Sequence, residues 1–339
     1  MTILELLQSN LLSPVVLCFL LGVLAAVVKS DLELPDAFVT ALSIYLLLAI
    51  GLKGGVELSK ASMAELIGPV LATLLAGMAV PIWSYAIVRW LGRFDVENAA
   101  AMAAHYGSCS VVTFITAVAY LQSQKVPVEG FLPALVAILE VPAIVVALLI
   151  ARLGQRRRAA RAIAENRDAE ELVRPAGTLG QAIHEVLAGR SVLLLIGGLL
   201  IGYAAGERQF DPVRLLFADA FRGILCLFLL ELGIKAASHF RDLRRVGPFL
   251  VVFALAMPVF NGAVGVMLGD ACGLSLGGAT AFGVLVASAS YIAAPAAVRI
   301  ALPRASPAYY LTASLAITFP FNLALGIPLY YLIAQRVCG

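Results

Sequence analysis

Charge is scarce in this sequence. Only 13% of its 339 residues are Asp, Glu, Lys or Arg, whereas 61% are hydrophobic and the mean hydropathy is +0.96. A soluble domain of this size carries about twice that share of charged residues. The composition therefore excludes an ordinary water-soluble protein.

Cysteine and histidine residues are too few and too scattered to predict a disulfide framework or a metal site. The five Cys show no paired spacing such as CxxC, and the three His show no ligand spacing such as HExxH. Three of the Cys lie inside apolar runs, which favours buried side chains over disulfides. No nucleophile elbow and no phosphate-binding Gly loop occurs either. We therefore expect neither an enzyme nor a nucleic-acid partner.

Long apolar runs, by contrast, recur along the whole chain. A helix that crosses a bilayer needs about 20 mostly apolar residues. Ten runs approach or exceed this length, at 11–29, 37–52, 65–91, 98–121, 129–151, 190–206, 213–236, 247–269, 277–300 and 307–335. The sequence predicts an all-α polytopic membrane protein with ten transmembrane helices.

Basic residues predict how the chain is oriented. The longest polar stretch, Ala151–Pro175, is rich in Arg and separates the fifth run from the sixth. Placing it in the cytoplasm puts 17 of the 24 Lys and Arg residues on the cytoplasmic side. Because cytoplasmic loops are enriched in Lys and Arg, this orientation is favoured. Both termini then face outward.

The two halves of the chain repeat one another. "AIGLKGGVEL" resembles "ELGIKAASHF", which aligns Lys53 with Lys235 at an offset of 182, and Pro142 aligns with Pro320 at an offset of 178. Five runs per half is an odd number, so the second half enters the membrane inverted, as in many secondary transporters. The predicted units are a first repeat (1–152), a cytoplasmic linker (153–188) and an inverted second repeat (189–339). Accidental similarity between Ala-, Gly- and Leu-rich helices is the alternative.

Two serine pairs stand at matched positions of this repeat. Ser108 and Ser110 lie in "HYGSCSVVTF", and Ser288 and Ser290 lie 180 positions later in "VASASYIAAP". One such pair alone usually provides interhelical hydrogen bonds. Two matched pairs predict interrupted helices in spans four and nine, whose N-termini bind a small anion. The hydroxyls of Ser110, Thr113, Ser288 and Ser290 are also candidate Na⁺ ligands.

Acidic residues inside apolar runs are costly and therefore imply a use. Glu140 lies deep in the fifth run, two residues before Pro142. It is the candidate carboxylate for a coupling cation, with a purely structural role as the alternative. Asp219 and Arg222 are three residues apart, and we expect them to neutralise one another on one helix face.

Several motifs together resemble a known family. "IGLKGGVEL", "AAHYGSCSVVTF", "LEVPAIVVALL", "ASASYIAAPAAVRIALPRASPAYYL" and "ITFPFNLALGIPLYYLIA" are similar, in this order, to the sodium-dependent bicarbonate transporter family (SbtA-type permeases). The resemblance covers nearly the whole chain. It implies an elevator-type fold with a core domain that slides against a gate domain, a homotrimer, and Na⁺-coupled bicarbonate uptake in the bacterial inner (plasma) membrane. It also implies a soluble PII-like regulator at the cytoplasmic face.

The resemblance also implies which residues bind substrate and ion. They are Tyr106, Gly107, Ser108, Ser110, Thr113, Glu140, Ser288, Ser290 and Pro295. The sequence departs from the family at Tyr291, where members carry Asp, and at Ala293–Pro295, where they carry Gly-Pro-Pro. The residues thus leave two alternatives open: a cation-coupled transporter of another small anion, such as a short carboxylate, and a membrane sensor or receptor without transport.

Overall fold

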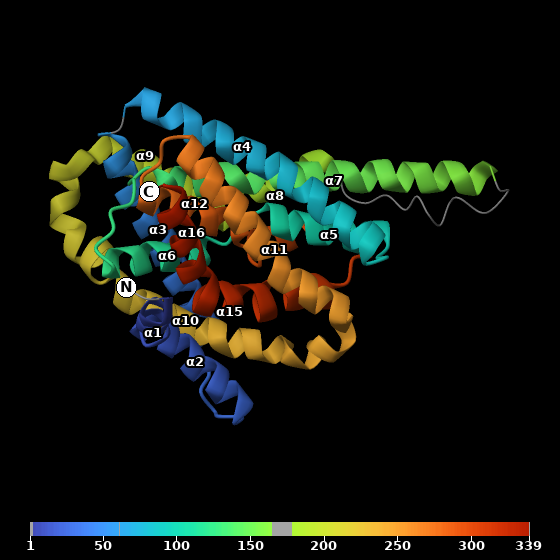
Figure 1. Ribbon diagram of the computed structural model, residues 1–339, viewed down its shortest axis with the longest axis horizontal. Helices are drawn as coiled ribbons and strands as arrows, with labels where there is room; N and C mark the ends of the chain where they lie inside the picture. The colour runs from blue at the N-terminus through green and yellow to red at the C-terminus, as the bar shows by residue number, and fades with distance from the viewer. Residues whose placement is uncertain (1–2, 61, 165–177, 339) are drawn as a thin grey trace.

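The computed structural model describes residues 3–60, 62–164 and 178–338, and these residues form helices without any strand (Figure 1). A helix satisfies its own backbone hydrogen bonds, which the interior of a bilayer requires. In chain order the α-helices are α1 (Ile3–Leu11), α2 (Pro14–Val27), α3 (Asp36–Leu58), α4 (Met63–Ala86), α5 (Val96–Gly107), α6 (Val111–Ser123), α7 (Leu132–Ala164), α8 (Leu179–Leu187), α9 (Arg190–Phe210), α10 (Phe221–Ser238), α11 (Leu243–Ala271), α12 (Leu276–Ala287), α13 (Ala293–Ala301), α14 (Pro307–Leu311), α15 (Phe319–Phe321) and α16 (Ile327–Val337).

The number of membrane spans differs from the ten expected. Eight helical segments of the described residues are long and apolar enough to cross a bilayer, and a ninth results if α1 and α2, bent by 59°, count as one span. The run at 277–300 does not form a continuous helix. It divides into α12 and α13 around residues 288–292, and neither half has the length of a span. The all-helical membrane fold is confirmed.

Helices α2, α3, α9 and α10 form a first helix group. Within it α2 packs against α10, and α3 packs against α9 and α10. Glycines allow these close approaches: a Cβ added at Gly22 would lie 1.9 Å from the Leu230 carbonyl oxygen, and one at Gly202 would lie 2.1 Å from that of Leu52. Such small-residue contacts are typical of membrane helix pairs.

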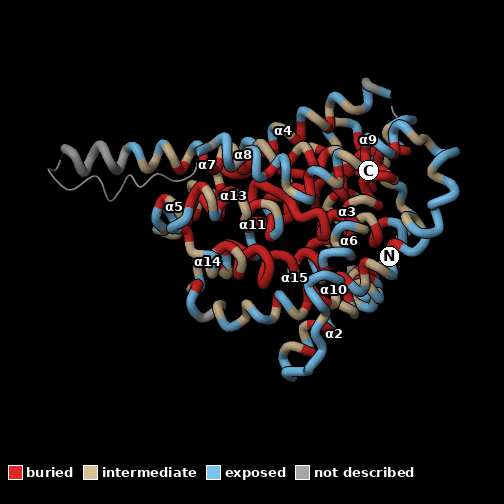
Figure 2. The backbone as a smooth tube through the Cα atoms, turned by 180° about the vertical axis from the view of Figure 1, so that it is seen from behind, coloured by how far each residue is buried: buried red, intermediate tan, exposed pale blue. Residues whose placement is uncertain are grey.

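The second helix group contains α4–α7 and α11–α16. Helices α4, α5 and α7 pack against one another, as do α11, α12 and α16. A bond between the Trp83 indole and Asn261 Oδ1, at 3.0 Å, joins α4 to α11. The buried residues gather in the middle of the molecule, whereas helices at its edge, such as α2, have one face exposed (Figure 2).

Both serine motifs break their helices, as predicted. Helix α5 ends at Gly107, Ser108 is extended, and α6 begins after Ser110. Helix α12 ends at Ala287, Ser288 is extended, and α13 begins at Ala293. In the span that contains the first break, 94% of the apolar window is buried inside the protein. This enclosure explains the breaks, because non-helical backbone at membrane depth must be surrounded by protein.

The connection between the halves begins with an extension of α7. This helix continues past the predicted end of its span to Ala164, and its last turns project beyond the other helices (Figure 1). Both termini lie toward the opposite end of the molecule. Residues 165–177 of the predicted linker lie outside the described residues, and α8, which follows them, packs against α13.

Candidate functional site

The two helix breaks meet at the centre of the protein. The backbone N–H of Ser110 donates to the Ser288 hydroxyl oxygen at 2.9 Å, which joins the first break to the second. The backbone N–H of Ser290 donates to the His105 carbonyl oxygen at 2.8 Å. Segments 180 residues apart in the sequence therefore form one polar centre inside an apolar bundle.

His105 holds the second break in place, a role that the sequence analysis missed. Its Nδ1 lies 2.6 Å from the Ser290 carbonyl oxygen, which only accepts hydrogen bonds, so Nδ1 carries the proton. The ring is buried and stacks on Tyr310, with centroids 4.4 Å apart. The available signal was its place in the first serine motif, three residues before Ser108.

Three of the four serines cap helices or bridge the breaks. The Ser110 hydroxyl accepts the Thr113 N–H at 3.2 Å, and the Ser290 hydroxyl accepts the Ala294 N–H at 3.1 Å. Ser288 accepts from Ser110 and donates to the Leu285 carbonyl at 2.8 Å. A hydroxyl oxygen has two lone pairs, so each of these oxygens retains one for a ligand.

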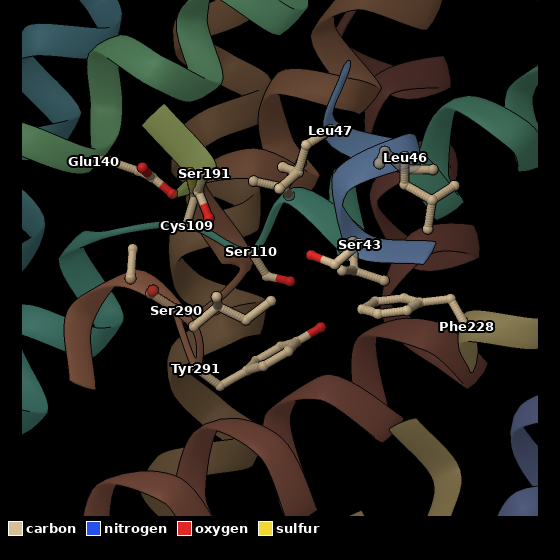
Figure 3. Close-up of a pocket in the computed structure, with 15 residues that line it drawn as sticks. Ser43, Leu46, Leu47, Cys109, Ser110, Glu140, Ser191, Phe228, Ser290 and Tyr291 are labelled. Carbon is tan, nitrogen blue, oxygen red and sulfur yellow. The ribbon is translucent and has the colours of Figure 1, made fainter. Parts of the chain in front are cut away.

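A small cavity lies between the breaks and the first helix group (Figure 3). Its volume is about 20 Å³, room for one water-sized species. The Ser43, Ser110 and Tyr291 hydroxyls point toward one another, and the Glu140 carboxyl points toward Ser191 and Cys109. The polar lining comes from α3 (Ser43), α9 (Ser191), α7 (Glu140) and the two breaks (Ser110, Ser290 and Tyr291).

Glu140 is the acidic group of this cavity. Its side chain is buried, and its Oε2 atom has no hydrogen-bond partner among the described residues. Within the ranges that the structure describes, no three or more His, Cys, Asp and Glu side chains form a group that could hold a metal ion. One carboxylate with serine hydroxyls in the same lining is a set of hard oxygen donors, which suits a hard cation rather than zinc or iron.

The structure brings only part of the predicted site to this cavity. Of the predicted residues, Ser110, Glu140 and Ser290 line it. Tyr106 instead bonds to the Thr318 hydroxyl at 2.7 Å. Ser108 and Thr113 are buried outside the lining, and the Ser108 hydroxyl has no hydrogen-bond partner among the described residues.

Gly107, Ser288 and Pro295 also lie off the cavity. A Cβ added at Gly107 would lie 2.4 Å from Pro81 Cγ, so Gly107 allows α5 to approach α4. Pro295 is buried on α13. Ser43 and Ser191 line the cavity without having been predicted, because each is a single serine in an apolar helix.

Two larger spaces flank the cavity. The first, here called the basic vestibule, has a volume of about 430 Å³ and is lined by Arg190, Lys235 and Arg299. It shares Ser43, Phe228, Tyr291 and Ile292 with the small cavity.

The second space, of about 330 Å³, is lined by Asn10, Thr116 and Arg222 and shares no residue with the small cavity. Arg222 donates to the Ala119 carbonyl at 3.1 Å and to Gln122 at 3.3 Å. No salt bridge joins it to Asp219 among the described residues, so the predicted neutralisation of this pair is wrong. The reason is that Arg222 reaches the carbonyl end of α6 instead.

Comparison with known proteins gives the family. No match is found among curated proteins. The sequence profile of the Na⁺-dependent bicarbonate transporter superfamily matches residues 14–335, a stretch that contains both helix breaks, Glu140 and both flanking spaces apart from Asn10 and Ser13. This is a family of transporters and not of enzymes. The chain therefore belongs to the Na⁺-dependent bicarbonate transporter superfamily.

Proposed function

We propose that the protein is a secondary active transporter that couples inward Na⁺ movement to bicarbonate uptake. The observation that carries this proposal is the meeting of two broken helices at a cavity with one buried carboxylate. Broken helices expose backbone groups and helix ends in the middle of a membrane, where secondary transporters hold their substrates and ions.

The helix N-termini beside the cavity supply the anion side. Val111 and Val112, the first residues of α6, line the cavity together with Ala293, the first residue of α13. Helix N-termini attract anions through free N–H groups and the positive end of the helix dipole. No Lys or Arg lines the small cavity, so the arrangement suits a small monovalent oxyanion such as bicarbonate.

Glu140 and the hydroxyls supply the cation side. Glu140 Oε2 is buried without a partner among the described residues, and a buried carboxylate needs a positive partner. The oxygens of Ser110 and Ser290 line the same cavity and complete a set of hard ligands. Na⁺ held there neutralises the carboxylate and favours an anion at the side of the cavity that adjoins the basic vestibule, which couples the two ligands.

The packing supports an elevator built from inverted repeats. When each helix is replaced by its counterpart in the other half of the chain, the packed pair α2–α10 becomes the packed pair α9–α3. In the same way, the cluster of α4, α5 and α7 becomes the cluster of α11, α12 and α16. The cavity lies between the helix groups, with Ser43 and Ser191 from the first and Ser110, Glu140 and Ser290 from the second. Sliding of the second group as a core against the first as a gate carries the ligands with it.

The two flanking spaces support alternating access. Of the two, the basic vestibule shares lining residues with the cavity and the second space does not, which supports a conformation that opens toward the vestibule. Arg190, Lys235 and Arg299, which line it, belong to the set that the basic asymmetry places in the cytoplasm. The conformation is thus inward-facing, and the Arg222 contacts with α6 close the outer side.

Flux measurements in liposomes test the transported anion. Purified protein should accumulate labelled bicarbonate only when an inward Na⁺ gradient is imposed. A short carboxylate such as acetate, added at a tenfold excess, should leave this uptake unchanged. Competition by acetate together with Na⁺-driven acetate uptake would identify a carboxylate transporter. Binding of an anion without any flux would identify a sensor and contradict the proposal.

We also propose that the protein is a homotrimer with a PII-like regulator docked on the linker. The end of α7 projects beyond the other helices, so deletion of Ala159–Val173 should leave the bundle intact. The expected result is loss of regulator binding in a pull-down, with Na⁺-driven uptake and a trimeric mass in native mass spectrometry retained. Regulator binding that survives the deletion would contradict this docking site.

A further inference from the structure

The basic vestibule carries an excess of positive charge. Arg190 begins α9, Lys235 lies on α10 and Arg299 lies on α13, so three different helices each contribute one cation. All three side chains are exposed to the vestibule, whose volume is about 430 Å³. Asp36 is the one acidic residue of its lining.

Internal ion pairs neutralise only part of this charge. Lys235 forms a salt bridge with Glu231 at 3.2 Å. Among the described residues, by contrast, neither Arg190 nor Arg299 forms a salt bridge. Arg299 lies beside the hydroxyl of Tyr310, which is a neutral group. Two guanidinium groups therefore line the vestibule without a salt-bridge partner in the part of the chain that the structure describes.

The vestibule adjoins the transport cavity. Ser43 and Tyr291 line both spaces, so an anion that leaves the cavity on this side passes the Tyr291 hydroxyl and reaches the cations. The cavity itself is lined by no Lys or Arg. The Lys and Arg side chains therefore line the vestibule and not the cavity. In a cleft with low-dielectric walls, this arrangement raises the local concentration of anions.

We propose that the basic vestibule is a second, low-affinity site for small monovalent oxyanions, formed by Arg190 and Arg299. The inference rests on the proposed function, because it assigns the site to the transported anion after release. A guanidinium binds an oxyanion through paired N–H donors without a fixed carboxylate competitor. Occupancy of the vestibule from the cytoplasm hinders further release, so the transported anion inhibits its own uptake from inside.

A cysteine probe measures the vestibule directly and needs no transport. Thr40 lines the vestibule and is exposed, so Thr40→Cys should react faster with a negatively charged methanethiosulfonate reagent than with a positively charged one. Adding Arg190→Gln and Arg299→Gln should lower this ratio about tenfold. Mass spectrometry of the peptide containing residue 40 separates its labelling from that of native cysteines. A ratio unchanged by the two substitutions would overturn the proposal.

Bicarbonate itself is the second probe. In the Thr40→Cys protein, 50 mM bicarbonate should slow labelling at residue 40 severalfold, and this protection should vanish in the Arg190→Gln and Arg299→Gln background. Chloride at the same ionic strength controls for screening. Equal slowing by both salts would show a general electrostatic effect without an oxyanion site and would overturn the proposal.

Uptake measurements then test whether internal bicarbonate inhibits transport through the vestibule. Uptake into liposomes preloaded with bicarbonate should fall for the parent and fall severalfold less for the double Arg variant. The charge-matched control is Lys29→Gln with Arg93→Gln: both residues are exposed, belong to the predicted cytoplasmic set and lie outside the vestibule lining. If internal bicarbonate lowers uptake equally in the control and in the double Arg variant, the inference is overturned. Na⁺-driven uptake, and hence the proposed function, would remain intact in that case.

Discussion

Replacing Glu140 by Gln tests the cation side of the site, because Gln has nearly the same shape and no charge. The Glu140 side chain is 1% exposed, and its Oε2 atom has no hydrogen-bond partner among the described residues. In the proposed function, Na⁺ is that partner. Removing one member of a buried charge pair costs about 3–5 kcal/mol. Since about 1.4 kcal/mol corresponds to a factor of ten, Na⁺ affinity should fall roughly 100-fold or more.

Uptake and thermal unfolding measure this loss independently. The Na⁺ concentration for half-maximal bicarbonate uptake should rise beyond the accessible range in Glu140→Gln. Na⁺ at 100 times its Kd should stabilise the parent by about 2.7 kcal/mol, and this gain should disappear in the variant. In Na⁺-free buffer the variant should unfold at or above the parent's Tm, because burying an unpaired charge costs more than burying an amide.

Glu129→Gln is the matched control. Glu129 Oε1 accepts the Ser275 N–H at 2.6 Å at the start of α12, its Oε2 atom is also buried without a partner among the described residues, and the residue does not line the cavity. Its substitution should leave the Na⁺ dependence of uptake unchanged. If Glu140→Gln also keeps the parent's Na⁺ dependence in both uptake and unfolding, Glu140 is a structural residue and the cation assignment is refuted.

Three further experiments test the serines, the orientation and the helix packing. Ser110→Ala should lower the free energy of unfolding by about 1 kcal/mol, because Ser110 is the N-cap of α6. The same substitution should also weaken Na⁺-driven uptake. Ser108→Ala removes a hydroxyl without a partner among the described residues and should leave the free energy of unfolding within about 0.5 kcal/mol of the parent. Parent-like uptake in Ala variants of all four serines would show that they only join helices. A cysteine at Ala169 should be labelled from the cytoplasm alone and one at the exposed Lys125 from outside alone, whereas labelling of both from one side would contradict the inverted repeat. Gly22→Ala should destabilise the protein by about 1–3 kcal/mol because its Cβ would lie 1.9 Å from the Leu230 oxygen, while Gly223→Ala, with open space around it, should be neutral or stabilising in a thermal unfolding assay.

Some features of the site could be predicted because they depend on local chemistry. Ser, Gly and Pro within an apolar run disfavour a continuous helix, and so "HYGSCSVVTF" and "VASASYIAAP" indicated both breaks. Glu140 stood out because a carboxylate in an apolar run is costly, and it does line the cavity. The ten predicted runs exceed the eight or nine helices that are long enough to cross a bilayer, because the interruption predicted in 277–300 leaves two helices that are each shorter than a span.

Composition and short motifs were enough to identify a helical membrane protein, the places where its helices break and the family to which it belongs. Which side chains come into contact could be learned only from the packed helices. The Ser110–Ser288 bond, the clamp of His105 on Ser290, and the placement of Ser43 and Ser191 at the cavity each depend on packing between helices far apart in the chain. The same packing turned Tyr106 toward Thr318 and away from the cavity, and gathered Arg190, Lys235 and Arg299 into one vestibule. A local motif fixes the backbone conformation of only a few residues, whereas side-chain contacts across the bundle depend on how closely whole helices approach. Small residues such as Gly22, Gly107 and Gly202 permit that approach at particular points.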